Sequence, residues 1–444
     1  MSVTPCPGAR RQVLRSRVGA LLLLAGLLPC LARAAAAPSR AELRRRYERA
    51  TAAHRAGDYQ AFLVESQVIA VLAPRSLRAR YNLACAHALL GQEAESLAIL
   101  DRFARMGVAY DLAADEDFAR IKGSLGFRAV VARMAALAAP VGSSRLAFTI
   151  PEKDLLPEGV THDPKTGAFF VSSVHKRKIL RVGPGGHVTD FVPEAQDGLL
   201  STLALAVDPA SRSLWVSTDG VPQTKGLLKK DEGRSAVIEY DLDTGRKRRA
   251  VGPPGASPGA RFADLTVGPG GDLWVADPYA GRLYVLRKGA ASLRAFLEPG
   301  TIESPQGLAF SPNGRWLFVA DYAQGIARID PANGAVALLD APVDAATTGV
   351  DGLVWGLGGL IGIQNGVRPH RVIRLRLDPG LERITEVSVL ERGNPRFDEP
   401  TLGVMVGDEL YYVANSQYGV FGENGHPDPV RLKDPVILRL RVSP

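Results

Sequence analysis

Four oxygen-bearing side chains stand at matching positions of a pattern that is repeated in the second part of the chain. Glu158, Asp264, Gln306 and Asp351 each come where an apolar segment begins that we expect to form a short strand. The matching residue in a further segment is Leu203, so a polar residue at this position is not a constant feature of the repeat. Carboxylate and amide oxygens that converge on one point suit a hard cation such as Ca²⁺ or Mg²⁺. The alternative is that these side chains bind water inside the fold or cap neighbouring strands.

A cation held in this way has a definite chemistry. It can polarise a carbonyl group or activate a water molecule, with a nearby carboxylate as the base. The sequence contains no nucleophile elbow, zinc motif or phosphate-binding loop that would favour another reaction. The candidate chemistry is therefore metal-assisted hydrolysis or simple ligand binding.

A second polar set follows the second expected strand of each segment. Its members are short side chains, namely Ser173, Thr218, Asp277, Asp321, Asn365 and Asn415. A short oxygen-bearing side chain caps a turn by accepting hydrogen bonds from backbone N–H groups. Because the set recurs in all six segments, we interpret it as a structural set of turn caps.

The segments themselves predict the fold that must position both sets. Each has an apolar strand, a turn, a second strand and a third strand, and successive copies lie roughly 43 to 60 residues apart, as propeller blades do. The last copy supplies three strands, over 403–406, 410–414 and 436–442, before the chain ends. Residues 146–150 can supply the fourth and close the ring without a free sheet edge. We predict a six-bladed β-propeller over residues 146–442.

In a propeller, the first strand of each blade lines the central channel. Its start opens on the same face as the loop after the second strand, so both polar sets should meet there. Three longer loops, over 220–235, 366–371 and 417–434, should project from this face, where long loops usually bind ligands. Arg368 and His370 in the second loop would suit an anionic or sugar-like ligand. The plainer interpretation of His370 is an ordinary solvated loop histidine.

The first part of the chain has a different composition. Residues 41–137 are rich in Ala, Leu, Arg and Glu at helical spacing, and the pairs Tyr47/Tyr81 and Gly57/Gly91 are each separated by 34 residues. That period is typical of tetratricopeptide (TPR) repeats. The sequence therefore predicts an N-terminal α domain with TPR-like helical repeats before the mainly β part. An array this short favours a structural role, with a peptide-binding groove as the alternative.

Residues 1–34 have the features of a signal peptide. A basic stretch precedes an apolar run over 18–28, and Ala32-Arg33-Ala34 offers a cleavage site. The run is too short for a spanning helix, so we expect no membrane span in the mature chain. The sequence predicts a periplasmic or secreted protein. Cys85 would be the one cysteine left, which excludes an intrachain disulfide.

The net charge gives little support to nucleic-acid binding. The chain carries +8, but residues 1–34 contain five arginines and no acidic residue, which leaves +3 for the remainder. A nucleic-acid partner needs a stronger basic footprint. We expect a small-molecule or protein ligand at the propeller face, and a peptide partner for the helical domain if its groove is used.

Residues 150–440 resemble the SMP-30/gluconolactonase/LRE-like family, which includes regucalcin and bacterial lactonases. The resemblance rests on four motifs, Pro157-Glu158-Gly159, Arg261-Phe262-Ala263-Asp264, Pro305-Gln306-Gly307 and Val350-Asp351-Gly352. It implies one divalent metal held by Glu158, Gln306 and Asp351, with Asp351 also the general base. It further implies that Arg261 and Asp264 contact the substrate. Gln306 and Ala263 each replace a family asparagine, and the longer Gln306 shifts the amide oxygen.

Two functions remain as hypotheses. The first is an exported propeller protein that binds a small ligand or a partner at the channel mouth, which the helical domain and the two replaced asparagines favour. The second is a divalent-metal-dependent lactonase or related hydrolase, which Glu158 and Asp351 favour. A chain that binds no divalent metal would rule out the second hypothesis.

Overall fold

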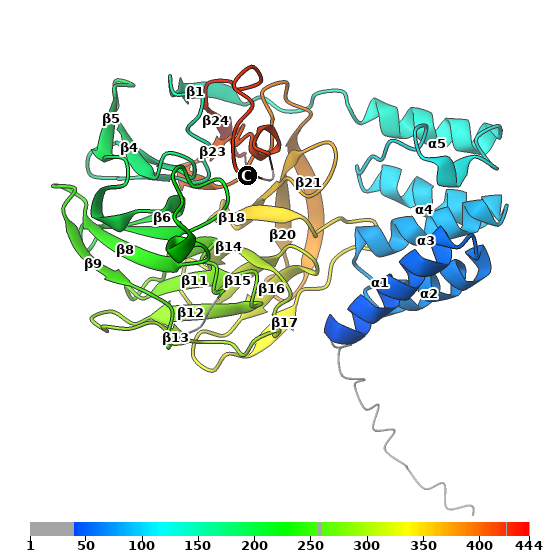
Figure 1. The fold of residues 1–444 in the computed structure, drawn as a ribbon, viewed down its shortest axis with the longest axis horizontal. Coiled ribbons are helices and arrows are strands. Elements are labelled where there is room, and N and C mark those ends of the chain that lie inside the picture. The colour runs from blue at the N-terminus through cyan, green and yellow to red at the C-terminus, as the bar shows by residue number, and fades with distance from the viewer. Residues whose placement is uncertain (1–39, 256–258, 423, 444) are drawn as a thin grey trace, which may run out of the picture. The chain divides into compact units, whose positions relative to one another are not determined.

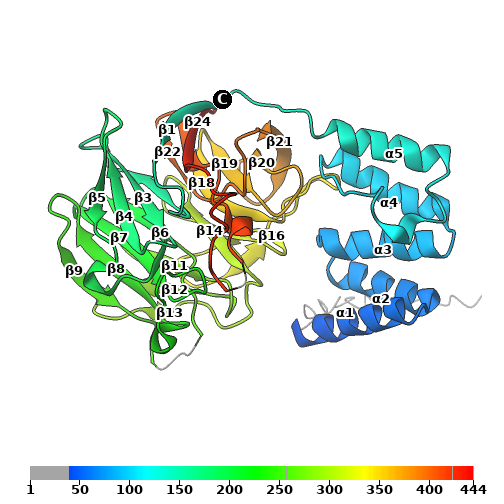
Figure 2. The same cartoon turned by 45° about the horizontal axis from the view of Figure 1, so that its top comes forward.

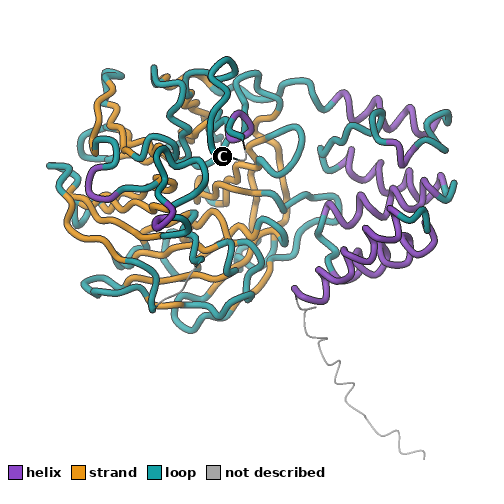
Figure 3. The backbone as a smooth tube through the Cα atoms, in the orientation of Figure 1, coloured by secondary structure: helices purple, strands orange, loops and turns teal. Residues whose placement is uncertain are grey.

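The structure is a computed structural model in which residues 40–255, 259–422 and 424–443 are described. The predicted signal peptide, residues 1–34, lies outside the described residues. Ser39–Pro444 forms one compact unit. Within this unit a run of helices is followed by a run of strands (Figures 1 and 3).

The helices come first. In the described residues there are five α-helices, α1 (Arg40–Arg55), α2 (Tyr59–Leu72), α3 (Leu77–Leu89), α4 (Glu93–Arg105) and α5 (Leu125–Ala136), and before α5 a short 3₁₀-helix, η1 (Glu116–Phe118). None of the described helices combines the length and the apolar character needed to cross a bilayer.

Two glycines explain why the helices form hairpins. Gly57 and Gly91 each have a φ of +73°, which ends α1 and α3 in the left-handed conformation that glycine adopts without strain. The start of α2 is capped by Asp58, whose side chain accepts a hydrogen bond from the Ala61 N–H, whereas Gln92 before α4 makes no such side-chain hydrogen bond. The 34-residue spacing thus corresponds to two helical hairpins. Their likeness to TPR repeats stays a prediction.

The strands build a six-bladed β-propeller, as predicted. In the described residues, 24 strands form six four-stranded sheets, and every pairing is antiparallel (Figure 2). The blades, in chain order, are these: blade one, β2 (Val160–His162), β3 (Phe169–Ser173), β4 (Lys178–Val182) and β5 (Val188–Val192); blade two, β6 (Ser201–Asp208), β7 (Ser213–Asp219), β8 (Ser235–Asp241) and β9 (Lys247–Val251); blade three, β10 (Asp264–Val267), β11 (Leu273–Asp277), β12 (Arg282–Leu286) and β13 (Arg294–Ala295); blade four, β14 (Pro305–Phe310), β15 (Leu317–Asp321), β16 (Gly325–Ile329) and β17 (Val336–Leu338); blade five, β18 (Val350–Gly356), β19 (Gly359–Gln364), β20 (Arg371–Leu377) and β21 (Ile384–Arg392); and blade six, β22 (Gly403–Val406), β23 (Glu409–Val413), β24 (Val436–Arg441) and β1 (Arg145–Thr149).

Blade six confirms the predicted ring closure. Its outer strand β1 comes from before blade one and pairs with β24 near the end of the chain, with Leu146 opposite Leu438. The pairing covers the edge of β24 and joins the two ends of the propeller sequence in one blade. The predicted fold class, mainly β with an N-terminal α domain, is therefore confirmed.

Glycines let neighbouring inner strands approach each other closely. A Cβ on Gly307 would lie 2.4 Å from the Leu353 nitrogen in the next blade, and a Cβ on Gly352 would lie 2.6 Å from the Thr401 oxygen. Gly159 is crowded in the same way, 2.7 Å from the Leu203 oxygen. Each of these glycines follows one of the predicted ligands, so the X-Gly pattern of the motifs is explained by blade packing at the channel.

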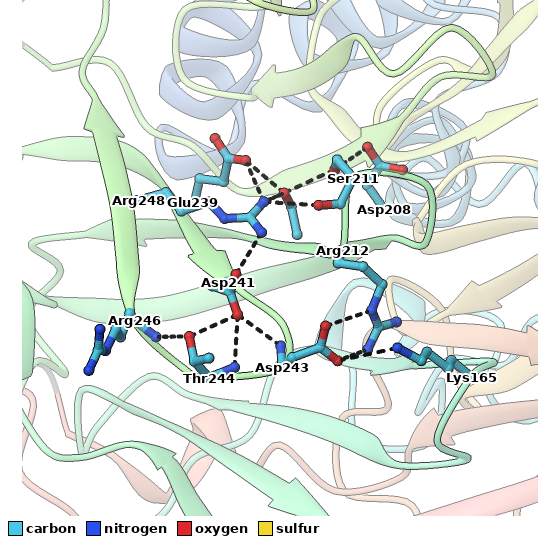
Figure 4. A network of polar contacts seen from close by, with 11 residues as sticks. Lys165, Asp208, Ser211, Arg212, Glu239, Asp241, Asp243, Thr244, Arg246 and Arg248 are labelled. Atoms are coloured by element: carbon cyan, nitrogen blue, oxygen red, sulfur yellow. Dashed lines mark hydrogen bonds and ion pairs between the residues drawn. The ribbon is translucent and has the colours of Figure 1, made fainter.

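The turns between first and second strands and between third and fourth strands lie on one face, which we call the turn face. There Arg212 donates to both carboxylate oxygens of Asp163, at 2.7 and 3.0 Å. Arg212 also donates to Asp243, within a wider polar network (Figure 4). The Arg212 hydrogen bonds hold the pKa of Asp163 well below its usual range. Further turn-face ion pairs are Arg248–Asp241, Arg287–Asp272, Arg315–Asp330, Arg383–Asp378 and Arg441–Asp408.

Candidate functional site at the channel mouth

The opposite face carries the starts of the first strands and the loops after the second strands, and we call it the mouth face. Three of the predicted carboxylates, Glu158, Asp264 and Asp351, lie there and affect one another's pKa values. The charges of Asp351 and Asp264 both act to raise the pKa of Glu158, and the charge of Asp351 acts in the same way on Asp264. The Glu158 carbonyl accepts a hydrogen bond of 2.7 Å from the Thr401 hydroxyl, which ties blade six to the start of blade one beside this group.

Glu158 is the carboxylate with the least support. Its Oε2 atom is buried and accepts no hydrogen bond within the described part of the chain. Burial raises the pKa of Glu158 well above its ordinary value, the nearby carboxylates add to the rise, and a hydrogen bond from Tyr418 opposes it in part. A buried anion without a positive partner is costly, so this position calls for a cation or a proton.

Asp351 is oriented by a short chain of hydrogen bonds. The Asn365 amide donates to Asp351 Oδ2 at 2.7 Å, and the Tyr322 hydroxyl donates to Asn365 Oδ1 at 3.0 Å. Burial raises the pKa of Asp351 to about 7, although the Asn365 hydrogen bond favours the charged form. A carboxylate with a pKa near neutrality is suited to accept and return a proton.

Asn365 is therefore a site residue that the sequence interpretation missed. The other members of its set accept hydrogen bonds from the backbone: Asp277 caps a turn by accepting from the Tyr279 and Ala280 N–H groups, and Asn415 accepts from the Val436 N–H in β24. Ser173, Thr218 and Asp321 also accept backbone N–H hydrogen bonds. Only its position in the same blade as Asp351 could have separated Asn365 from the others.

Glu399 is a second residue that the sequence did not indicate. It lies in the connection to blade six, and its charge acts to raise the pKa values of Glu158 and Asp351. Its φ of +63° places it in the left-handed region, and its carbonyl accepts hydrogen bonds from Ser416 N at 3.3 Å and Ser416 Oγ at 2.9 Å. Burial raises the pKa of Glu399, while Arg368 lowers it. No motif surrounds this residue, so pattern analysis had no means of finding it.

The predicted substrate-side residues of blade three are engaged by the protein itself. Asp264 accepts hydrogen bonds from the backbone N–H groups of Leu265, at 2.8 Å, and Leu308, at 3.2 Å. Burial raises the pKa of Asp264 to about 7. Arg261 donates to Asp219 at 2.7 Å and to the Gly220 carbonyl at 3.1 Å. Their role toward a substrate stays a prediction.

The loop after β19 holds the other two predicted ligand-binding residues. Arg368 is exposed and hydrogen-bonds the imidazole of His370. Burial and the Arg368 charge lower the pKa of His370 to about 4, so the imidazole is neutral at pH 7. His370 is half-buried, in contrast to an ordinary solvated loop histidine. The neutral ring accepts the hydrogen bond from Arg368, and the Arg368 charge also acts to lower the pKa of Glu399.

The chemical types of these side chains suit a divalent cation, but their arrangement suits it less well. The buried, unsupported Glu158 oxygen and the mutually repelling carboxylates supply the hard oxygen ligands that Ca²⁺ or Mg²⁺ prefers. In the described residues, however, no three His, Cys, Asp or Glu side chains are grouped so as to hold a metal ion. A complete site would combine Glu158 and Asp351 with an amide oxygen, for which Gln306 is the predicted donor.

Comparison with known proteins confirms the resemblance over much of the propeller. Residues 156–354 match the SMP-30/Gluconolactonase/LRE-like region. The matched range contains Glu158, Asp264, Gln306 and Asp351, whereas Asn365 and Glu399 lie beyond it. A search of curated proteins finds no match to this chain. The matched residues cover blades one to four and the start of blade five, and over this part the propeller is similar to that region.

Several solved structures have similar folds. A gluconolactonase from Xanthomonas campestris is 18% identical, with a TM-score of 0.44, over 69% of this chain and 92% of that one. The calcium-binding protein regucalcin from Agrobacterium tumefaciens is 17% identical, with a TM-score of 0.47, over 67% and 94%. Virginiamycin B lyase from Staphylococcus aureus is 14% identical, with a TM-score of 0.46, over 68% and 100%. Similarities this low do not assign an activity to this chain.

Proposed function

We propose that the protein binds a divalent cation at the channel mouth and hydrolyses a lactone or a related ester. The observation that carries the proposal is the unsupported Glu158 oxygen beside Asp351, whose carboxylate is oriented by Asn365. The match of residues 156–354 to the SMP-30/gluconolactonase/LRE-like region supports the same chemistry. Glu158, Asp351 and the Gln306 amide would hold the ion.

The residues of the chain perform the proton transfers. A divalent ion held by these residues would supply positive charge that polarises the ester carbonyl. Asp351 accepts a proton from the attacking water, whose oxygen bonds to the carbonyl carbon. The carbon–oxygen bond of the ring or ester then breaks, and the proton passes from Asp351 to the departing oxygen, which yields a hydroxy acid or an acid and an alcohol. Asn365 keeps the Asp351 carboxylate in position during both transfers.

A second function, ligand binding without turnover, is favoured by one specific observation. Arg261, predicted to contact the substrate, is already paired with Asp219 at 2.7 Å. Ala263 also lacks the amide that the resemblance leads us to expect. Under this alternative the mouth binds a cation and an oxygen-rich ligand, but no product forms. Export of the protein to the periplasm or the medium is part of either proposal and rests on residues 1–34.

The test measures cation binding and turnover separately. Purified protein is treated with chelator and then with Ca²⁺, Mg²⁺, Mn²⁺ or Zn²⁺, and the melting temperature and the hydrolysis of γ- and δ-lactones are followed. We expect one of these ions to raise the melting temperature and to start hydrolysis in the wild-type protein, and neither effect in Glu158→Gln. A rise in melting temperature without hydrolysis supports the binding function, and no rise with any ion rejects both.

A further inference from the structure

A cavity of about 670 Å³ lies beside the mouth, between the helical domain and the loop after β19. Its volume is in the range of about 300 to 1,000 Å³ that is usual for small-molecule sites. Apolar side chains of the helical domain, Val108, Leu112, Val131 and Met134, line one side. Residues 365–368 line the other.

The two walls of this cavity are fixed to each other by buried contacts. Arg371, which is 1% exposed, donates to the Met106 carbonyl at 2.8 Å and to the Gly107 carbonyl at 3.1 Å. The Ala109 N–H donates to the Arg368 carbonyl at 2.7 Å. Val367 belongs to the same buried apolar cluster as the helices. A buried arginine that satisfies backbone carbonyls across the junction makes this a packed interface.

Gly107 shows how closely the helical domain approaches. Its φ is +68°, and a Cβ there would lie 2.8 Å from Arg371 Nη1. Arg102 and Arg105 add ion pairs to Asp344 on the propeller, at 2.9 and 3.0 Å. The position of the cavity wall is thus determined by several independent contacts.

Asn365 connects the cavity to the mouth. It lines the cavity and also donates to Asp351 at 2.7 Å. Arg368, which lines the cavity as well, lies close enough to Glu399 to lower its pKa. The polar end of the cavity therefore adjoins the carboxylates, while its apolar end lies against α5 and the segment before η1. A molecule with a polar head and an apolar arm matches this order of surfaces.

We propose that the cavity holds the apolar arm of the same lactone or ester whose carbonyl group is bound at the mouth. This inference rests on the proposed function and extends it to a substrate class, namely esters or lactones with a medium to long alkyl or aryl substituent. It also gives the helical domain a role, because that domain supplies the apolar wall. Short lactones without a substituent lack that contact and bind weakly.

Chain-length dependence is the expected signature. Each methylene that enters an apolar cavity strengthens binding by about fourfold. We therefore expect KM or Kd to fall steeply from γ-butyrolactone to γ-dodecalactone and to level off when the cavity is full. Binding is measured by calorimetry with the chelated protein, and KM with the cation-loaded protein.

Two variants on one helix provide a matched comparison. Ala135 lines the cavity and is exposed, whereas its neighbour Ala136 is exposed but does not line it. Ala135→Phe fills the cavity and should weaken the binding of γ-dodecalactone by about tenfold or more, with the binding of γ-butyrolactone unchanged. Ala136→Phe should leave the Kd and KM of both ligands at their wild-type values. Equal melting temperatures would show that both variants fold.

The outcomes separate this inference from the proposed function. If γ-dodecalactone binds in a length-dependent manner that Ala135→Phe removes, but no lactone is hydrolysed, then the cavity assignment stands and the hydrolase proposal fails. If lactones are hydrolysed without dependence on chain length, or if Ala135→Phe and Ala136→Phe behave alike, the cavity does not hold the substrate arm.

Discussion

The two faces of the propeller use the same acidic residue types in opposite ways. On the turn face, Asp163, Asp241 and Asp330 each have an arginine partner, which lowers the pKa of the carboxyl group. On the mouth face, burial raises the pKa values of Asp264 and Asp351 to about 7. We infer from this difference that the turn-face carboxylates stabilise the blades, whereas the charged forms of the mouth carboxylates reduce stability when no cation is bound.

Breaking the turn-face network should give the largest change in stability. Asp163 is 1% exposed, so Arg212→Met leaves a buried carboxylate without its partner and should lower the free energy of unfolding by about 3 kcal/mol. Urea-induced unfolding measures the loss. Arg441→Met is the matched control, because the Arg441 side chain is 75% exposed and its pair with Asp408 should contribute no more than about 0.5 kcal/mol. Equal losses in the two variants would contradict the assigned difference in burial.

Removing a carboxylate at the mouth should have the opposite effect and raise the free energy of unfolding. Glu158→Gln removes a buried carboxyl group whose charged form has no positive partner, so the chelated protein should become more stable at pH 8, by on the order of 1 kcal/mol. The same variant should lose the stabilisation by divalent cations. A less stable Glu158→Gln protein in chelator would mean that the carboxylate is satisfied in the native state and needs no cation.

The pH dependence of stability should also distinguish the faces. The folded-state pKa of Asp264 is raised to about 7, so the folded chain binds an extra proton between the unfolded-state pKa, about 4, and pH 7. The chelated protein should therefore lose stability as the pH rises through this window. Asp264→Asn should make the loss shallower, by up to about 1 kcal/mol per pH unit, in urea unfolding series at pH 5 to 8.

The turn face provides the opposite reference for that experiment. The Asp163 pKa is lowered, so its stabilising effect is present above pH 4 and disappears only in more acidic solution. Arg441→Met should retain the wild-type slope between pH 5 and 8. If Asp264→Asn retains it too, the raised pKa of Asp264 does not contribute to stability in this window.

The smallest expected effect comes from the hydrogen bond by which Tyr322 orients Asn365. Tyr322→Phe removes the hydroxyl that donates to Asn365 Oδ1 at 3.0 Å, but leaves the Asn365–Asp351 hydrogen bond in place. Loss of one such hydrogen bond should reduce kcat by about fivefold, with little change in KM or in melting temperature. A change in KM alone would place Tyr322 in ligand binding instead.

The fold followed from the sequence because it depends on repetition. The six blades, the strand supplied by residues 145–149 and the clustering of Glu158 with Asp351 at one face all derive from a regular pattern of strands and turns. Each blade repeats the same order of four antiparallel strands, so a short sequence signal is reinforced several times.

The rest of the candidate site depends on single residues outside that pattern. Asn365 has the same type and position as the capping residues of the other blades, and only its contact with Asp351 reveals its different role. Glu399 lies in a connection with no recognisable motif. The cavity beside the mouth needs the helical domain and blade five to meet, and this contact joins residues more than 200 positions apart, such as Met106 and Arg371. Local patterns contain no information on such contacts.

The central claim is that the mouth face binds a divalent cation between blades one and five. Crystals of the protein prepared with Mn²⁺ test it directly, because the ion is located by its anomalous scattering. The account predicts a peak at about 2.0 to 2.6 Å from carboxylate oxygens of both Glu158 and Asp351. A map with no peak at the mouth, or with peaks only at the turn face, would contradict it.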